Sequence, residues 1–221
     1  MNVGKHISKD IKALTLDDKI EDALALMDEM KLNHLPVVDE AAQYLGLVDE
    51  ESLLEAQLDG ETIALCNRCL KPYSAKLDGH ILEVARIAGD GILSMVPIVD
   101  KNNVYRGYIS PLELLQDLGS QITFKEEGGV IVLKIPVSDY QLSQIAQIVE
   151  SEDARILGLI IGSSSDMNSI DVTLKINQTD LGRIIKSFER YSYSIMEVYH
   201  KSMFDDSSAQ RYESLMRYLN I

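Results

Sequence analysis

The sequence predicts a protein of the α/β (α+β) class, with two small βαββα units in tandem followed by a βαββαβ domain. The first observation is an internal duplication: at an offset of 61 residues, Leu14–Leu54 aligns with Ala75–Leu115 without a gap. The second is a linker at residues 126–129, beyond which the hydrophobic pattern changes. We therefore expect the tandem pair at residues 1–125 and the further domain at residues 129–201.

The two copies, called copy one and copy two, share one order of elements. The first helix of each copy has its apolar residues on one face: Ile20, Ala23, Leu24 and Met27 in copy one, and Ile81, Val84, Ala85 and Ala88 in copy two. We expect Asp17 and Asp78 to cap these helices. A Pro-containing apolar strand follows (35–38 or 96–99), then a polar turn, a second strand (44–48 or 105–109) and a closing helix.

The motifs "HLPVVD…YLGLVDEESLL" and "MVPIVD…YRGYISPLELL" resemble a tandem pair of CBS domains, with copies at about 7–58 and 68–120. The resemblance implies a regulatory module that binds an adenosine-containing ligand, such as AMP, ATP or S-adenosylmethionine, in the cleft between the copies. It implies a sensor rather than an enzyme.

In that family, a Gly-h-h-Ser/Thr-x-x-Asp segment binds the ligand where a strand meets a helix N-terminus, which favours an anion. Copy two places Gly107, Ser110 and Glu113 at these positions, and the resemblance adds Lys76 and the strand residues Val96 and Pro97 to the ligand site.

Copy one departs from this motif, because Asp49 stands at the hydroxyl position and Ser52 at the carboxylate position. Asp49 would bring a negative charge to the place of a phosphate, so we expect ligand in copy two only. An alternative remains open for copy two. Ser110-Pro111-Leu112-Glu113 is also a helix capping box that needs no ligand, and Asp49 is an equally good N-cap for copy one.

The hydrophobic pattern of residues 129–201 predicts a ferredoxin-like βαββαβ order, with strands near 130–135, 156–161, 170–176 and 195–199. We expect Ser138 or Asp139 to cap the first helix. The order resembles an ACT domain, but Leu142 stands where that family has a glycine at its amino-acid site. We therefore favour a dimerisation role. Residues 202–221 predict a C-terminal amphipathic helix.

Composition limits the function classes. The net charge is −14, and residues 1–128 hold 12 Lys and Arg against 23 Asp and Glu, which opposes nucleic-acid binding. No long apolar segment predicts a membrane span, so we expect a cytoplasmic protein. Cys66 and Cys69 lack further metal ligands or a catalytic context.

The sequence therefore predicts a non-catalytic homodimer with no cofactor or metal beyond its regulatory ligand, and we expect a regulated enzyme as its partner. The alternative is a scaffold with a degenerate nucleotide site.

Overall fold

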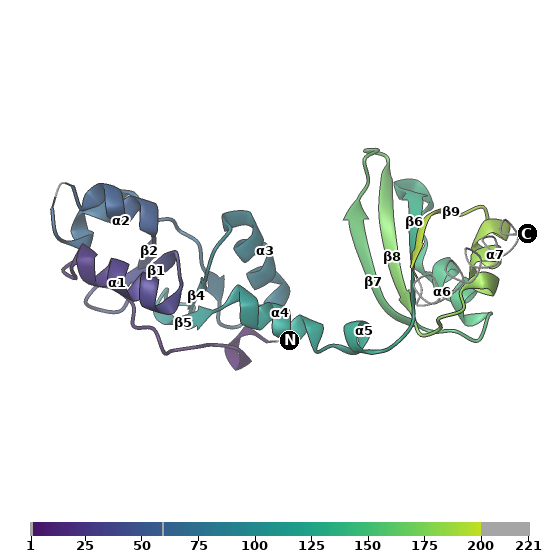
Figure 1. The fold of residues 1–221 in the computed structure, drawn as a ribbon, viewed down its shortest axis with the longest axis horizontal. Helices are drawn as coiled ribbons and strands as arrows, with labels where there is room; N and C mark the ends of the chain where they lie inside the picture. The colour runs from purple at the N-terminus through teal and green to yellow at the C-terminus, as the bar shows by residue number, and fades with distance from the viewer. Residues whose placement is uncertain (1, 59, 200–221) are drawn as a thin grey trace, which may run out of the picture. The chain divides into compact units, whose positions relative to one another are not determined.

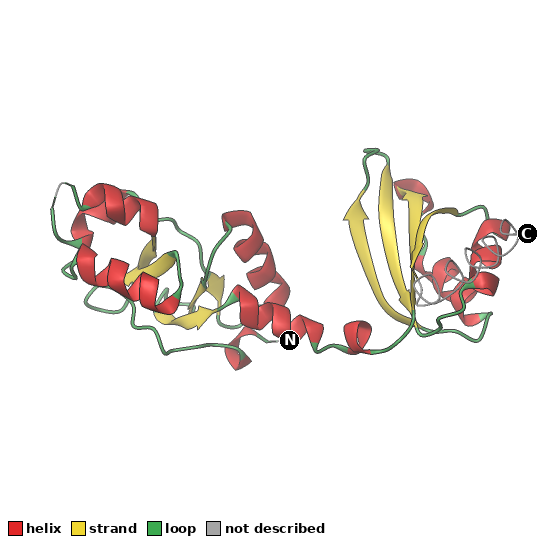
Figure 2. Cartoon of the chain, in the orientation of Figure 1, coloured by secondary structure: helices red, strands yellow, loops and turns green. Residues whose placement is uncertain are grey.

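The computed structural model describes residues 2–58 and 60–199, and the chain divides into two compact units, Met1–Gly119 and Ser120–Ile221 (Figure 1). Unit one contains both copies of the repeat, and unit two contains the domain that follows the linker. Helices and strands alternate in both units (Figure 2). Among the described residues, no helix combines the length and the apolar character needed to cross a membrane.

Copy one is built from α1 (Ile20–Met30), β1 (His34–Val38), β2 (Tyr44–Asp49) and α2 (Glu50–Ala56). Copy two repeats it with β3 (Ala75–Lys76), α3 (Ile81–Gly91), β4 (Val96–Val99), β5 (Tyr105–Ile109) and α4 (Pro111–Gly119). Two short 3-10 helices, η1 (Val3–Lys5) and η2 (Ile63–Arg68), precede the copies. The predicted elements of the repeat are confirmed, although the first strand of copy one is reduced to a single parallel bridge between Leu14 and Val37.

The predicted caps of α1 and α3 are wrong. Both helices begin later than expected, with Lys19 and His80 at the N-cap positions. Lys19 provides no side-chain cap, whereas His80 Nδ1 accepts a hydrogen bond from the Leu82 N–H at 3.3 Å. The aspartates lie too far upstream to reach the free N–H groups of the first turn.

The hairpins of the two copies meet at their tips. The backbone N–H of Tyr44 donates to the Asn103 carbonyl at 2.9 Å, and that of Tyr105 donates to the Ala42 carbonyl at 3.0 Å. The two exchanges are equivalent under the repeat, so the copies face each other about a local two-fold axis. Residues of both copies share one hydrophobic core, which is why neither copy is a separate compact unit.

The segment that enters each copy first crosses to the other copy. In the N-terminal arm (residues 2–13), Ser8 pairs with Tyr108 of β5, and in the connecting segment (residues 69–74), Lys71 pairs with Leu47 of β2. Gly46 precedes Leu47 and Gly107 precedes Tyr108, and the lack of a side chain at both positions lets the crossing segment lie against the strand. A Cβ at Gly107 would lie 2.4 Å from Ile7 Cγ2 and 2.5 Å from the Ser8 carbonyl oxygen.

Unit two begins with α5 (Ile122–Lys125) and continues with β6 (Gly129–Pro136), η3 (Val137–Asp139), α6 (Leu142–Glu150), β7 (Ile156–Ser163), β8 (Ser169–Ile176), α7 (Gly182–Arg190) and β9 (Ser194–Tyr199). The strands form one antiparallel sheet in the order β7-β8-β6-β9. Alternating residues of β6 pack under α6 and α7, and Phe188 meets Tyr193 edge to face.

The βαββαβ order predicted for unit two is the order that the structure has. The expected cap at Ser138 or Asp139 is wrong, because both residues lie in η3 and Gln141 precedes α6. Leu142 is the first residue of α6 and is half-exposed. The relationship to ACT domains stays a prediction, and the predicted helix at residues 202–221 lies outside the described residues.

Candidate functional site

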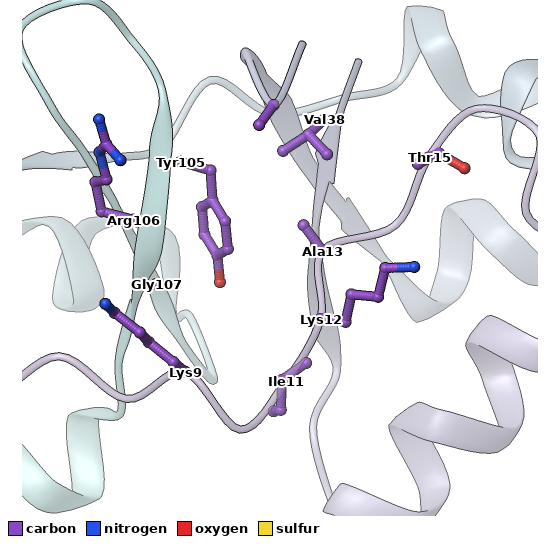
Figure 3. A pocket seen from close by; sticks show the side chains of 10 residues that line it. Lys9, Ile11, Lys12, Ala13, Thr15, Val38, Tyr105, Arg106 and Gly107 are labelled. Carbon is purple, nitrogen blue, oxygen red and sulfur yellow. The ribbon is translucent and has the colours of Figure 1, made fainter. Parts of the chain in front are cut away.

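Unit one contains a cavity of about 410 Å³ between the N-terminal arm and β5 (Figure 3). Residues from four segments line it. They are Lys9, Ile11, Lys12, Ala13 and Thr15 from the arm and its continuation, Val38 from β1, Ala42 from the tip of the first hairpin, and Tyr105, Arg106 and Gly107 from β5. The cavity thus combines both copies, since the arm precedes copy one and β5 belongs to copy two.

The lining is apolar in its middle and basic at its edges. Ile11, Ala13 and Val38 present aliphatic side chains, while Lys9, Lys12 and Arg106 bring three cations to an acidic part of the chain. Arg106 is paired, because its Nε donates to Asp100 at 2.9 Å. Neither lysine has a carboxylate within 4.0 Å among the described residues. Such a lining suits a ligand with an apolar body and a negative charge.

Of the six residues expected to bind ligand, only Gly107 lines this cavity. Val96 and Pro97 are buried in β4, opposite Ile109 and Tyr108 of β5. Lys76 is exposed in β3 beside Val99. Gly107 has a φ of +131° and lies against the arm, so close packing with Ile7 and Ser8 explains the glycine without any ligand.

Ser110 and Glu113 make contacts within the chain. Ser110 Oγ accepts a hydrogen bond from the Leu112 N–H at 3.3 Å, as an N-cap does. Glu113 accepts one from Ser8 Oγ at 3.2 Å, which ties its carboxylate to the arm. In the structure, Ser110 therefore caps α4 and Glu113 binds the arm. The role of the two residues as a ligand motif stays a prediction.

The equivalent position in copy one is closed by an ion pair. Asp49 Oδ2 lies 2.6 Å from Lys71 Nζ, and Asp49 Oδ1 accepts from the Ser52 N–H at 2.8 Å. Burial by itself would raise the pKa of the Asp49 carboxyl, but the hydrogen bonds from Lys71 and Ser52 outweigh it and lower the pKa to about 2. The sequence identified Asp49 as a cap but gave no sign of Lys71 as its partner, because the pair forms only when the connecting segment crosses copy one.

Sequence reasoning missed the arm as part of the site. Lys9, Ile11, Lys12 and Ala13 precede the region of gap-free alignment, so the repeat did not mark them. Tyr105 matches Tyr44 at the offset of 61 residues, but this match indicates a shared structural position rather than a ligand site. The signal in the sequence that indicates the arm is the presence of two lysines, Lys9 and Lys12, in an otherwise acidic unit.

The two cysteines are the remaining candidates for reactive chemistry that the sequence offers. Cys66 is buried, Cys69 is exposed, and both are free thiols. Burial raises the pKa of the Cys66 thiol, with the neighbouring Cys69 adding to the effect, which disfavours the nucleophilic thiolate. Within the described residues, no group of three or more His, Cys, Asp or Glu side chains is placed to hold a metal ion.

Comparison with known proteins gives a family match for copy one. Residues 3–59 match the family model of the CBS domain. A protein of Methanocaldococcus jannaschii is 22% identical over 131 residues, which cover 59% of this chain and 49% of the relative. A 17.7 kDa protein of Acidianus ambivalens is 34% identical over 61 residues, which cover 28% of this chain and 37% of the relative. The chain thus spans about half or less of these relatives.

A solved structure of a CBS domain pair/ACT domain protein from Thermotoga maritima is similar with a TM-score of 0.48 and 20% identity, over 53% of this chain and 96% of that chain. The family match itself covers copy one. Copy two repeats the same order of elements as copy one.

Proposed function

We propose that the first unit is a non-catalytic regulatory module that holds an adenosine-containing ligand, of the AMP, ATP or S-adenosylmethionine type, in the cavity of Figure 3 and changes the geometry of a homodimer. The observation that carries the proposal is the cavity itself: about 410 Å³, lined from both copies, apolar within and basic at its edges. Small-molecule sites usually occupy roughly 300–1,000 Å³, so an adenosine moiety is of suitable size.

The ligand's base fits the aliphatic part of the cavity, between the arm and Val38. Its anionic group has two candidate places. The first is beside Lys9 and Lys12, which have no carboxylate partner in the part of the chain that the structure describes. The second is the N-terminus of α4, where Ser110 and Glu113 would bind it as the family motif implies. Lys76, Val96 and Pro97 belong to the second placement.

Titration calorimetry with AMP separates these placements. A double variant, Lys9→Ala with Lys12→Ala, is expected to weaken AMP binding by at least about tenfold, since losing a charge-assisted contact costs roughly 1.5–3 kcal/mol. Glu113→Ala reports on the α4 placement, and Asp49→Ala in copy one is the matched control. Loss of binding in Glu113→Ala with unchanged binding in the lysine variant would place the phosphate at α4 instead.

A scaffold function is the second candidate, and one observation favours it: Ser110 and Glu113 already satisfy contacts within the chain. Thermal-shift measurements with AMP, ADP, ATP and S-adenosylmethionine distinguish the two. A ligand at 100 times its Kd stabilises the folded protein by roughly 2.7 kcal/mol. No shift with any of the four would refute the sensor and favour the scaffold.

The cytoplasmic location, the homodimer and a regulated enzyme as partner remain predictions from the sequence. The dimerisation role of unit two belongs with them.

A further inference from the structure

The two halves of the repeat differ at one matched pair of tyrosines. Tyr44 and Tyr105 are equivalent residues, each at the first position of the second strand of its hairpin. The Tyr44 hydroxyl donates to the Tyr73 carbonyl of the connecting segment at 2.6 Å. The Tyr105 hydroxyl oxygen is buried and has no hydrogen-bond partner among the described residues. Figure 3 shows that its ring points into the gap between β5 and the arm.

The length of the crossing segments explains this difference. Ser8 and Lys71 are equivalent anchors, because they pair with the equivalent residues Tyr108 and Leu47. Leu14 and Ala75 are the next anchors, because they pair in parallel with Val37 and Ile98. Six residue steps separate the anchors in the arm, but only four separate them in the connecting segment.

The arm therefore has two more residues than its counterpart has for the same span. At about 3.3 Å per extended residue, they add roughly 7 Å of chain that must bulge away from β5. Four of the ten residues that line the cavity, Lys9, Ile11, Lys12 and Ala13, lie in this longer segment. In the other half, the shorter segment lies close to the hairpin, and its carbonyl reaches Tyr44.

We infer that the two-residue extension of the arm creates one ligand site per chain, in which the ligand supplies to Tyr105 the hydrogen-bond acceptor that Tyr73 supplies to Tyr44. The ligand is an adenosine compound with an acceptor atom on its uncharged part and an anionic group near Lys9 and Lys12. This inference rests on the proposed function. It adds a stoichiometry of one ligand per chain and names Tyr105 as the residue that determines specificity.

The chemistry of the phenol fits a donor in this place. Burial raises the pKa of the Tyr105 hydroxyl, with the neighbouring Tyr108 and Asp10 adding to the effect, so the group keeps its proton at neutral pH. A buried donor without a partner destabilises the unliganded protein, and a ligand acceptor removes that penalty on binding. Selection therefore favours ligands with an acceptor in that position over analogues that lack one.

Two phenylalanine variants of the full chain test the inference, with AMP as the probe. Calorimetry on the wild type should give one AMP per chain. Tyr105→Phe should weaken AMP binding by about tenfold, while leaving the Tm of the unliganded protein unchanged or higher. Tyr44→Phe is the matched control: it should lower the Tm, because it leaves the Tyr73 carbonyl unpaired, and leave AMP affinity unchanged.

Deleting Lys12 and Ala13 equalises the two crossing segments and should abolish AMP binding. Two AMP molecules per chain, or equal effects of the two phenylalanine variants on affinity, would overturn the inference and leave the proposed function standing. Unchanged affinity in Tyr105→Phe would show that the hydroxyl makes no hydrogen bond to the ligand and would also overturn the inference. No AMP binding by the wild type would overturn the proposed function, and the inference with it.

Discussion

Replacement of Gly107 by alanine should detach the N-terminal arm from copy two. Gly107 has a φ of +131°, which L-residues adopt at a cost of about 1–3 kcal/mol. The new Cβ would also lie 2.4 Å from Ile7 Cγ2 and 2.5 Å from the Ser8 carbonyl oxygen, and overpacking of this kind costs about 1–3 kcal/mol. The two effects together destabilise the arm's contact by about 3 kcal/mol.

Hydrogen exchange measures this loss at the contact itself. The Ser8 N–H donates to the Tyr108 carbonyl at 2.8 Å, and the Tyr108 N–H donates to the Ser8 carbonyl at 3.0 Å. A loss of about 3 kcal/mol corresponds to exchange of these two amides that is about 100 times faster. Because the arm lines the cavity, AMP affinity should fall in the same variant.

Gly89 provides the control. It lies within α3, and a Cβ there would meet nothing within 4 Å. Gly89→Ala should therefore stabilise the protein by about 0.5–1 kcal/mol through helix propensity, with unchanged exchange at Ser8 and Tyr108. Unchanged protection of both amides in Gly107→Ala would refute the argument that this glycine serves the crossing of the arm.

Three further outcomes are expected. The Asp49 pKa of about 2 lies below its ordinary value of 3.8, so the stability that Lys71 provides is present above pH 4 and is lost as the pH falls towards 2. Because Lys71 is 47% exposed, Lys71→Met should lower the free energy of unfolding at pH 7 by only about 1 kcal/mol. Urea unfolding measured at decreasing pH should show this difference from wild type vanish near pH 2. In titrations at two salt concentrations, AMP or S-adenosylmethionine should bind better than ATP without magnesium. The reason is that each added phosphate is repelled by the net negative charge of the protein. Tight magnesium-independent ATP binding would contradict this. Light scattering should give a mass of about twice 24.7 kDa, and a monomer at micromolar concentration would exclude the homodimer.

The sequence by itself determined the local structure of the repeat. The offset of 61 residues located both hairpins and both closing helices, because turn, strand and cap signals act over a few neighbouring residues. Asp49 and Ser110 were recognised as caps, and both cap in the structure. Alternating hydrophobicity likewise predicted the βαββαβ order of unit two. The caps at Asp17 and Asp78 failed because helix ends depend on backbone geometry that composition does not specify.

Only the tertiary structure decided which segments meet across the repeat. The arm pairs with β5 about 100 residues later in the chain, and no local pattern encodes a contact of that separation. The same crossing brings Lys71 to Asp49 and makes Lys9, Lys12 and Tyr105 line one cavity. The gap-free alignment begins at Leu14, so the two extra residues of the arm lie just outside it. The effect of these two residues becomes clear only in the structure, where backbone pairs fix both ends of each crossing segment. The longer segment has to bulge because it spans the same distance as the shorter one.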